Sequence, residues 1–234
     1  NADVTVNAVN MSSDQLEDIS DAISKVDTIN NLSLTNGELA VEIGNLLSKS
    51  VDAAVDAGSM IAGQITQVAD NISGVASDGI SNLTLTTAQD ADEIIALLGI
   101  NTSTDSVSVI ATGMSVAKLN AVAAEIDEVS SISGVVSVTS DLAAANLTTL
   151  AGQLTYAAGA DELSVNASGM SAAQLSAVAV VIAKVDDDGL SSLTLTDGNT
   201  VDEDVITTLL GDKTEDATVS VVATGMSAAK LNKI

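Results

Sequence analysis

Oxygen-bearing side chains are the main groups in this sequence that could do chemistry, because it contains no histidine and no cysteine. Without those residues, the usual nucleophile–base pairs and the thiolate or imidazole sites that hold transition metals cannot be built. A pair of carboxylates could still transfer protons, as in glycosidases. No acidic pair lies in an apolar stretch of the kind that tunes catalytic carboxylates, so we expect no enzyme activity.

Two acidic segments near residue 190 have the composition of calcium-binding turns. They are Asp186-Asp187-Asp188-Gly189 and Asp197-Gly198-Asn199, and they bracket one expected strand. Calcium prefers hard oxygen ligands clustered on tight turns. Neither segment completes a calcium-loop pattern, and the alternative is that these turns are simply solvated. The hypothesis is a calcium site at Asp186, Asp187, Asp188 and Asp197, with calcium as the cofactor.

Other acidic clusters are better explained by helix electrostatics. They fall in the first turn of expected helices, where negative charge interacts favourably with the helix macrodipole. The clusters are Asp90, Asp92 and Glu93, and Asp202, Glu203 and Asp204. We therefore interpret them as structural.

Hydroxyl side chains form Thr-x-Thr pairs that are expected in register on one open sheet face. The pairs are Thr84/Thr86 and Thr194/Thr196, together with Ser33/Thr35 and Ser137/Thr139. A flat ladder of this kind resembles ice-binding β-solenoids. Interleaved strands interrupt it, because other residues hold the comparable positions: Asn7, Asp56, Ile110, Asn166 and Val222. Solvated residues with high β-propensity are the simpler explanation.

The elements that position these groups become visible when the chain is aligned on its five methionines. Aliphatic residues stand seven, five and three positions before each methionine, as in Val107, Val109 and Ala111 before Met114. Polar residues occupy most of the positions between them. This period of two predicts a strand with one buried face that ends at the methionine. The methionines themselves are interpreted as packing at the strand-to-helix corner.

A helical stripe follows each methionine. After Met114 it comprises Leu119, Val122, Ile126 and Val129, spaced by three or four residues. In four copies a serine directly follows the methionine, where its hydroxyl can cap the helix: Ser12, Ser115, Ser171 and Ser227. Gln15 and Gln174 complete capping boxes. Glycine precedes the methionine in three copies and permits the turn.

A second strand type alternates with the first, and each copy is followed by another helix. These strands are expected at 32–35, 83–86, 136–139 and 193–196, with Asp188-Gly189 as a turn before the last of them. Their helices are expected at 38–48, 90–98, 142–154 and 201–210. Nine strands then alternate with nine helices, with about 27 residues per strand–helix unit.

This alternation predicts the α/β class. Strand-helix-strand units of this length predict parallel neighbours joined by right-handed crossovers. Because the strands alternate and are not uniformly apolar, we place all the helices on one face. The expected fold is a right-handed solenoid with a single-layer parallel sheet, helices on one face and two alternating unit types. Residues 1–234 are expected to form one continuous array, a segment of a longer protein or filament.

Charge and hydropathy exclude several partners. Lys and Arg total 7 against 32 Asp and Glu, for a formal charge of −25, which disfavours contact with nucleic acids and anionic lipid heads. The longest apolar run, from Ala177 to Ala183, is far shorter than the roughly 20 residues of a spanning helix, so no membrane insertion is expected. Self-association, flanking repeats of the same protein, or surface glycans are the expected partners.

The layout resembles leucine-rich-repeat-type α/β solenoids, and the composition resembles large, acidic, aromatic-poor repeat proteins of bacterial cell surfaces. This resemblance implies a non-enzymatic structural or adhesive segment of an extracellular surface, matrix or filament protein, secreted and self-assembling. The alternative function is a binding module that uses the hydroxyl-rich inner sheet face to hold a glycan, a peptide or ice. The two differ in whether one non-repeating patch exists on that face.

Overall fold

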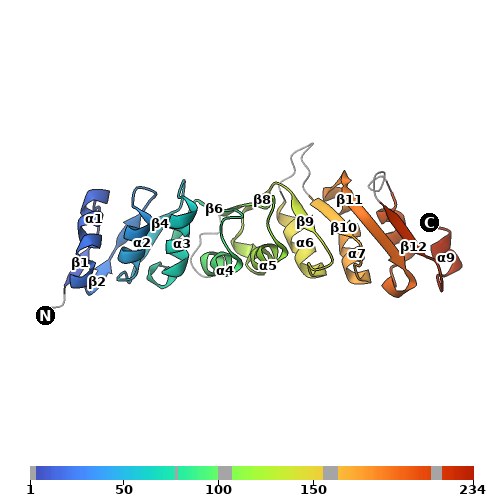
Figure 1. Cartoon of the computed structure of the whole chain (residues 1–234), viewed down its shortest axis with the longest axis horizontal. Helices are drawn as coiled ribbons and strands as arrows, with labels where there is room; N and C mark the ends of the chain where they lie inside the picture. Colours follow the sequence, from blue (N-terminus) through green and yellow to red (C-terminus); the bar gives the residue numbers. More distant parts are fainter. Residues whose placement is uncertain (1–3, 77–78, 100–106, 155–162, 212–217) are drawn as a thin grey trace. The chain divides into compact units, whose positions relative to one another are not determined.

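The computed structural model (Figure 1) describes residues 4–76, 79–99, 107–154, 163–211 and 218–234, with the backbone alone at residues 186–188. Within these ranges, nine α-helices alternate with strands that form four parallel sheets, so the α/β class is confirmed. Contacts divide the chain into two compact units, residues 1–109 with 127–130 and residues 110–126 with 131–234.

Helices follow the methionines and the second strand type, as expected. Those after the methionines are α1 (Ser13–Asp21), α3 (Ala62–Asp70), α5 (Val116–Ala124), α7 (Ala172–Val180) and α9 (Ala228–Leu231). The others are α2 (Ala40–Leu47), α4 (Ala91–Gly99), α6 (Ala144–Gln153) and α8 (Glu203–Leu209). The helices of the second set begin and end within two residues of their expected bounds.

The expected strands are present and most are shorter than predicted, whereas the one expected at 193–196 already begins at Val185. Those that lead to the methionines are β1 (Thr5–Asn7), β4 (Ala53–Asp56), β7 (Val107–Ile110), β10 (Leu163–Ala167) and β12 (Val219–Val222). Those of the second type are β2 (Thr28–Asn30), β3 (Leu32–Leu34), β5 (Ile80–Ser81), β6 (Leu83–Leu85), β8 (Ser131–Ser133), β9 (Val136–Val138) and β11 (Val185–Thr196).

In three copies a further short strand, β2, β5 or β8, precedes the expected second-type strand, and the sequence pattern did not predict it or the break between the two. The breaks lie at residues with positive φ, namely Asn31, Asn82 and Gly134. A left-handed residue cannot continue the pleat, and asparagine and glycine tolerate this conformation best. The fourth copy, β11, is continuous.

The helices after the methionines are also shorter than the stripe predicted. The first four, α1, α3, α5 and α7, end after about two and a half turns. They continue as 3-10 turns at Ile23–Lys25, Ile72–Gly74, Ile126–Glu128 and Ile182–Lys184. The isoleucine that opens each of these turns is only half-buried, whereas the valine that follows the turn is buried in every copy.

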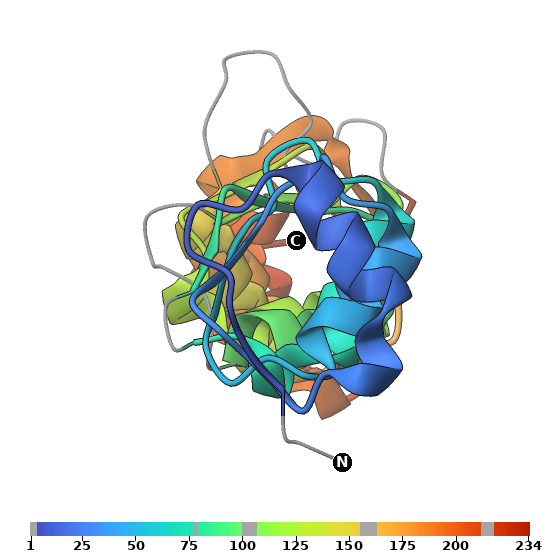
Figure 2. The ribbon, with the colours of Figure 1, turned by 90° about the vertical axis from the view of Figure 1, so that its left-hand side faces the viewer.

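In the first unit, α1, α2 and α3 lie side by side in chain order (Figure 1). Figure 2 shows these blue-to-cyan helices on one side of the chain's path and the strands on the other. Parallel pairs join β1 to β2, β3 to β4, β4 to β5 and β6 to β7. In the second unit, β9, β10, β11 and β12 form one parallel sheet, and neighbouring helices again contact each other.

The core of each unit contains alternate strand residues and the apolar stripes of the helices. In the first unit, Ile29, Leu32 and Leu34 of the strands and Ile43 and Leu46 of α2 are each at most 1% exposed. Aliphatic side chains fill this space without aromatic help. Four methionines are buried at the strand-to-helix corners, and Met11 is half-buried. No helix in the described ranges combines the length and apolarity that crossing a membrane requires.

Candidate functional site

The turn before each methionine has the same geometry in all five copies. The methionine N–H donates to the carbonyl of the alanine three residues earlier, at 2.9–3.3 Å, from Met11–Ala8 to Met226–Ala223. The residue before each methionine has positive φ: Asn10, Ser59, Gly113, Gly169 and Gly225. Positive φ at the third position of such a turn is the type II signature. Asn10 and Ser59 therefore adopt the conformation that glycine provides in the other copies.

Serines cap the helices that follow, as the sequence predicted. Ser12, Ser115, Ser171 and Ser227 each accept a hydrogen bond from the backbone N–H three residues later. Gln15 and Gln174 complete the predicted capping boxes. These contacts fix the angle at which each strand turns into its helix.

The turn after each second-type strand contains a polar feature that the sequence analysis missed. A side chain three residues after the final threonine folds back and accepts its N–H. Glu38 accepts from Thr35 at 2.8 Å, Gln89 from Thr86 at 2.9 Å and Asn199 from Thr196 at 2.7 Å. These three polar side chains are at most 9% exposed, and Leu142 is buried at the fourth equivalent position. The sequence signal that could have indicated this feature is the polar residue three positions after the final threonine of the strand.

Polar side chains also join consecutive turns. Gln64 of α3 accepts from the N–H of Ile61 and donates to the carbonyls of Asn36 and Glu38, at 3.2 and 2.6 Å. In the second unit, Gln174 donates equivalently to the carbonyls of Ser140 and Leu142. One glutamine thus caps its own helix and satisfies two carbonyls of the preceding turn.

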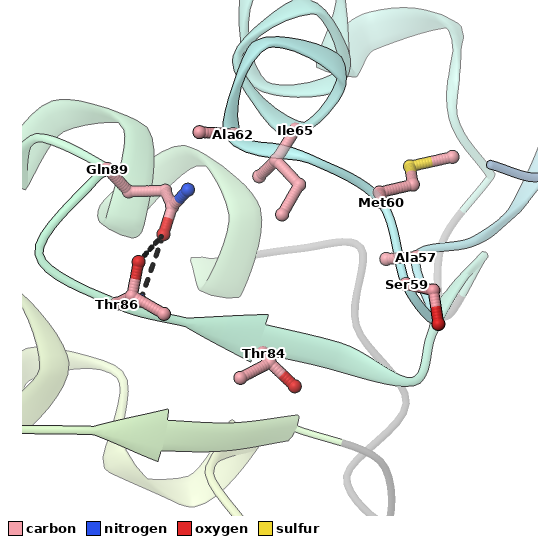
Figure 3. Close-up of a pocket in the computed structure, with 8 residues that line it drawn as sticks. All are labelled: Ala57, Ser59, Met60, Ala62, Ile65, Thr84, Thr86 and Gln89. Carbon is pink, nitrogen blue, oxygen red and sulfur yellow. Dashed lines mark hydrogen bonds between the residues drawn. The ribbon is translucent and has the colours of Figure 1, made fainter.

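A pocket of about 290 Å³ lies between the turn at Met60 and the turn at Thr86 (Figure 3). Its polar lining is made by Ser59, Thr84, Thr86 and Gln89, and its apolar lining by Ala57, Met60, Ala62 and Ile65. All eight residues belong to the first unit. The lining carries no charged group, so the pocket offers hydrogen bonds beside apolar carbon.

The open sheet face carries small side chains, mostly hydroxyls, in short pairs. The pairs in register are Ser33 with Ala54, Thr84 with Ser108, Ser137 with Ser164, and Thr194 with Ser220. Val55 lies opposite Leu34 on one side but opposite Ile80, five residues before Leu85, on the other. Because of this stagger, the pair of Ser33 and Ala54 is not in register with the pair of Thr84 and Ser108. The prediction that the Thr-x-Thr pairs share one register is therefore wrong for Ser33 and Thr84.

One carboxylate on this face is held by neighbouring groups. Asp56 accepts hydrogen bonds from Asn82 Nδ2 at 2.8 Å and from the N–H of Gly58 at 3.0 Å. The Asn82 bond, followed by the Gly58 bond, lowers the pKa of the Asp56 carboxyl. In the first copy, Asn7 accepts from Asn31 and Val9 in the same way.

The structure defines the surroundings of several of the predicted acidic residues. Asp90 and Glu93 form a reciprocal cap at the start of α4, with backbone-to-carboxylate distances of 2.9 and 2.8 Å, which supports their structural interpretation. Asp197 is exposed. Its carboxylate lies beside Gly225, where an added Cβ would be 3.0 Å from Asp197 Oδ2. Asp186, Asp187 and Asp188 lie within β11, so the expected turn at Asp188-Gly189 is wrong: the chain is extended there.

The side chains of residues 186–188 lie outside the described part, so the distances between the four predicted calcium ligands are not defined. Among the side chains that are described, no three acidic residues are grouped so that they could hold a metal ion. The calcium site therefore stays a prediction. Searches against known proteins place the chain in no group, since no family model and no curated protein matches it.

Proposed function

We propose that this chain is a non-enzymatic structural repeat segment of a large extracellular bacterial surface, matrix or filament protein. In this proposal its role is to contribute length and a regular surface, through self-association or flanking repeats of the same protein. The observation that carries the proposal is the recurrence of one turn geometry before all five methionines. Recurrence of this kind favours a scaffold, because a catalytic or binding site needs one turn to differ from the rest.

The bridges between turns support the same proposal. Gln64 and Gln174 each connect a helix start to the preceding turn, so every bridged turn depends on its neighbour. Stability in such a protein is a sum of repeat and nearest-neighbour terms. The proposed architecture is a right-handed solenoid with a single-layer parallel sheet, helices on one face and about 27 residues per strand–helix unit.

The surface supports an extracellular setting. A charge of −25 with hydroxyl-rich exposed strands keeps an extended surface hydrated and prevents its collapse onto other anionic polymers. We propose secretion and cell-surface localisation on this basis. Surface glycans are the proposed external partner, since they are neutral or weakly charged and present hydroxyl groups.

An image of the native assembly tests the proposal. Electron micrographs of the protein isolated from its source should show a continuous array of units of equal width, or chains associated with one another. Isolated monomers whose ends are covered by non-repeating elements would exclude the array. Labelling with an antibody against residues 218–234 would show whether this segment lies inside the array.

Calcium binding at Asp186, Asp187, Asp188 and Asp197 is a separate proposal with its own test. Thermal unfolding is followed while calcium is added, with magnesium as the control because it demands a stricter geometry. A midpoint that rises with calcium and not with magnesium is expected, and it should not rise in the variant Asp187→Asn. An unchanged midpoint in calcium excludes the site.

A further inference from the structure

The amide of Gln89 has a fixed orientation. Its Oε1 accepts from the backbone N–H of Thr86 at 2.9 Å and lies 3.4 Å from Thr86 Oγ1. A backbone N–H can only donate, so the oxygen and not the nitrogen must face Thr86. The amide nitrogen therefore points the other way, into the pocket beside Ala62 and Ile65 (Figure 3).

This nitrogen is buried without a partner. Gln89 is 1% exposed, and within the described residues its Nε2 makes no hydrogen bond. Buried side-chain donors in native proteins are nearly always satisfied by protein, water or a ligand. The unfilled donor therefore indicates that something else enters the pocket.

The equivalent side chains elsewhere are satisfied by the protein itself. Glu38 accepts from Ser13 Oγ at 2.8 Å, and Asn199 Nδ2 donates to the carbonyl of Met170 at 2.6 Å. Ser13 stands two residues after Met11, and Ala62 holds that place after Met60. Alanine also holds that place after Met170, at Ala172, but there the shorter Asn199 amide reaches the carbonyl of Met170. Among these three buried side chains, Gln89 is the one whose donor has no partner within the described residues.

The lining selects the chemistry of the occupant. Ser59 and Thr84 provide hydroxyls that can donate or accept, while Met60 and Ile65 provide buried apolar carbon. The Thr86 hydroxyl already donates to Gln89 Oε1 and accepts from the Ala88 N–H. No lining residue is charged, and the acidic surface as a whole repels anions. A volume of about 290 Å³ is at the small end for ligand pockets.

We infer that this pocket binds a neutral polyhydroxyl molecule of monosaccharide size. One oxygen of the sugar accepts from Gln89 Nε2, another hydroxyl contacts Thr84, and the C–H face of the ring packs on Met60 and Ile65. This site goes beyond the structural role and does not depend on it, since a single chain contains the whole pocket.

Two variants test the inference. Gln89→Glu keeps the acceptor for the Thr86 N–H, as Glu38 does for Thr35, but removes the donor. Ala62→Ser restores the hydroxyl that Ser13 provides in the first copy and gives Gln89 an internal partner. The control is Asn199→Asp, which makes the same amide-to-acid change where the protein already supplies the partner.

The measurement is an NMR titration of the isotope-labelled full chain with D-glucose, D-galactose and N-acetyl-D-glucosamine. It follows the backbone amide resonances of Ala62 and Thr86 in every variant and, where position 89 is glutamine, its side-chain NH2 resonances as well. At least one sugar should shift them saturably, with affinity reduced at least about tenfold in Ala62→Ser and in Gln89→Glu and unchanged in Asn199→Asp. No saturable shift up to about 100 mM of any sugar would overturn the inference and leave the pocket to water. Equal affinity in wild type and Ala62→Ser would overturn it as well, even where Gln89→Glu does not fold.

Discussion

The residue before each methionine determines the cost of the turn, because its backbone must be left-handed. Glycine adopts this conformation freely, whereas other L-residues lose roughly 1–2 kcal/mol in a helical left-handed segment. Asn10 and Ser59 hold it without that freedom. Asparagine at the first copy is the mildest replacement, since its short side chain tolerates positive φ.

Gly169→Ala isolates this conformational cost. A Cβ at Gly169 would meet only Ser140 Oγ, at 4.0 Å, so no steric clash contributes. We expect a loss of about 1 kcal/mol in the free energy of unfolding in urea. The matched control is Gly152→Ala in α6, which has no atom within 4 Å and should gain roughly 0.5–1 kcal/mol from better helix propensity. Equal effects at both positions would contradict the assigned turn.

Asp56 gives the turn a pH dependence. Its hydrogen bonds to Asn82 and Gly58 lower the pKa of the folded-state carboxyl, so the native state favours the charged form. The stability that this contributes is fully present above the ordinary carboxyl pKa of about 4 and is lost as the pH falls through the lower folded-state pKa.

Asp56→Asn provides the comparison, because Asn7 already performs the acceptor role in the first copy. The thermal midpoint of wild type minus that of Asp56→Asn should be constant above about pH 5 and should fall as the pH drops below about 4. A difference that stays constant down to the lowest pH at which both proteins fold would show that the carboxylate bonds contribute nothing.

At the scale of elements, Gln64 and Gln174 at helix starts connect their own helix to the preceding turn within the same compact unit. Gln64 makes three hydrogen bonds, of which two reach the preceding turn, and it is buried. Gln15, in the equivalent place of the first copy, is exposed and accepts only within its own cap. The same residue type therefore has a local role in one helix and a connecting role in another.

Gln64→Met should be far more costly than Gln15→Met. The first change leaves the carbonyls of Asn36 and Glu38 without their donor, which should cost about 2–3 kcal/mol in unfolding free energy. The second removes one exposed capping bond and should cost less than about 1 kcal/mol. Urea denaturation of both variants measures the difference, and similar losses would refute a connecting role for Gln64.

The sequence pattern was sufficient for elements whose signals are local. Serine after methionine predicted the caps, and the aliphatic period predicted which strand residues are buried, as at Val107, Val109 and Ala111. It could not predict the stagger at Val55, because alternation defines the face of a residue but not which neighbouring segment lies opposite. The breaks at Asn31 and Asn82 were within reach, since asparagine favours positive φ.

The candidate pocket was less predictable from sequence. Glutamine at position 89 looks like a surface residue, and only the folded turn shows that its oxygen is taken by Thr86 while its nitrogen is left over. The comparison that exposes it, Ala62 against Ser13, requires an alignment of repeats and the knowledge that these positions face the following turn. Hydrogen-bond accounting of this kind depends on three-dimensional contacts.

At the scale of the whole molecule, the proposed array implies that its repeat units are interchangeable. One such repeat unit contains both strand types, each followed by its helix. Val55 and Val109 hold equivalent positions five residues before Met60 and Met114. A second copy of residues 56–109 inserted after Val109 therefore preserves both strand types, both turns and the order of the helices. Inserting residues 56–85 alone breaks that order and serves as the control.

Far-ultraviolet circular dichroism with urea unfolding of these two insertions tests the claim most directly. In the full-block insertion, we predict an unchanged mean residue ellipticity and a total unfolding amplitude that grows in proportion to the added residues. The half-block insertion should lose ellipticity per residue. If the full block also loses ellipticity per residue, or if both insertions behave alike, the units are not interchangeable and the structural array is wrong.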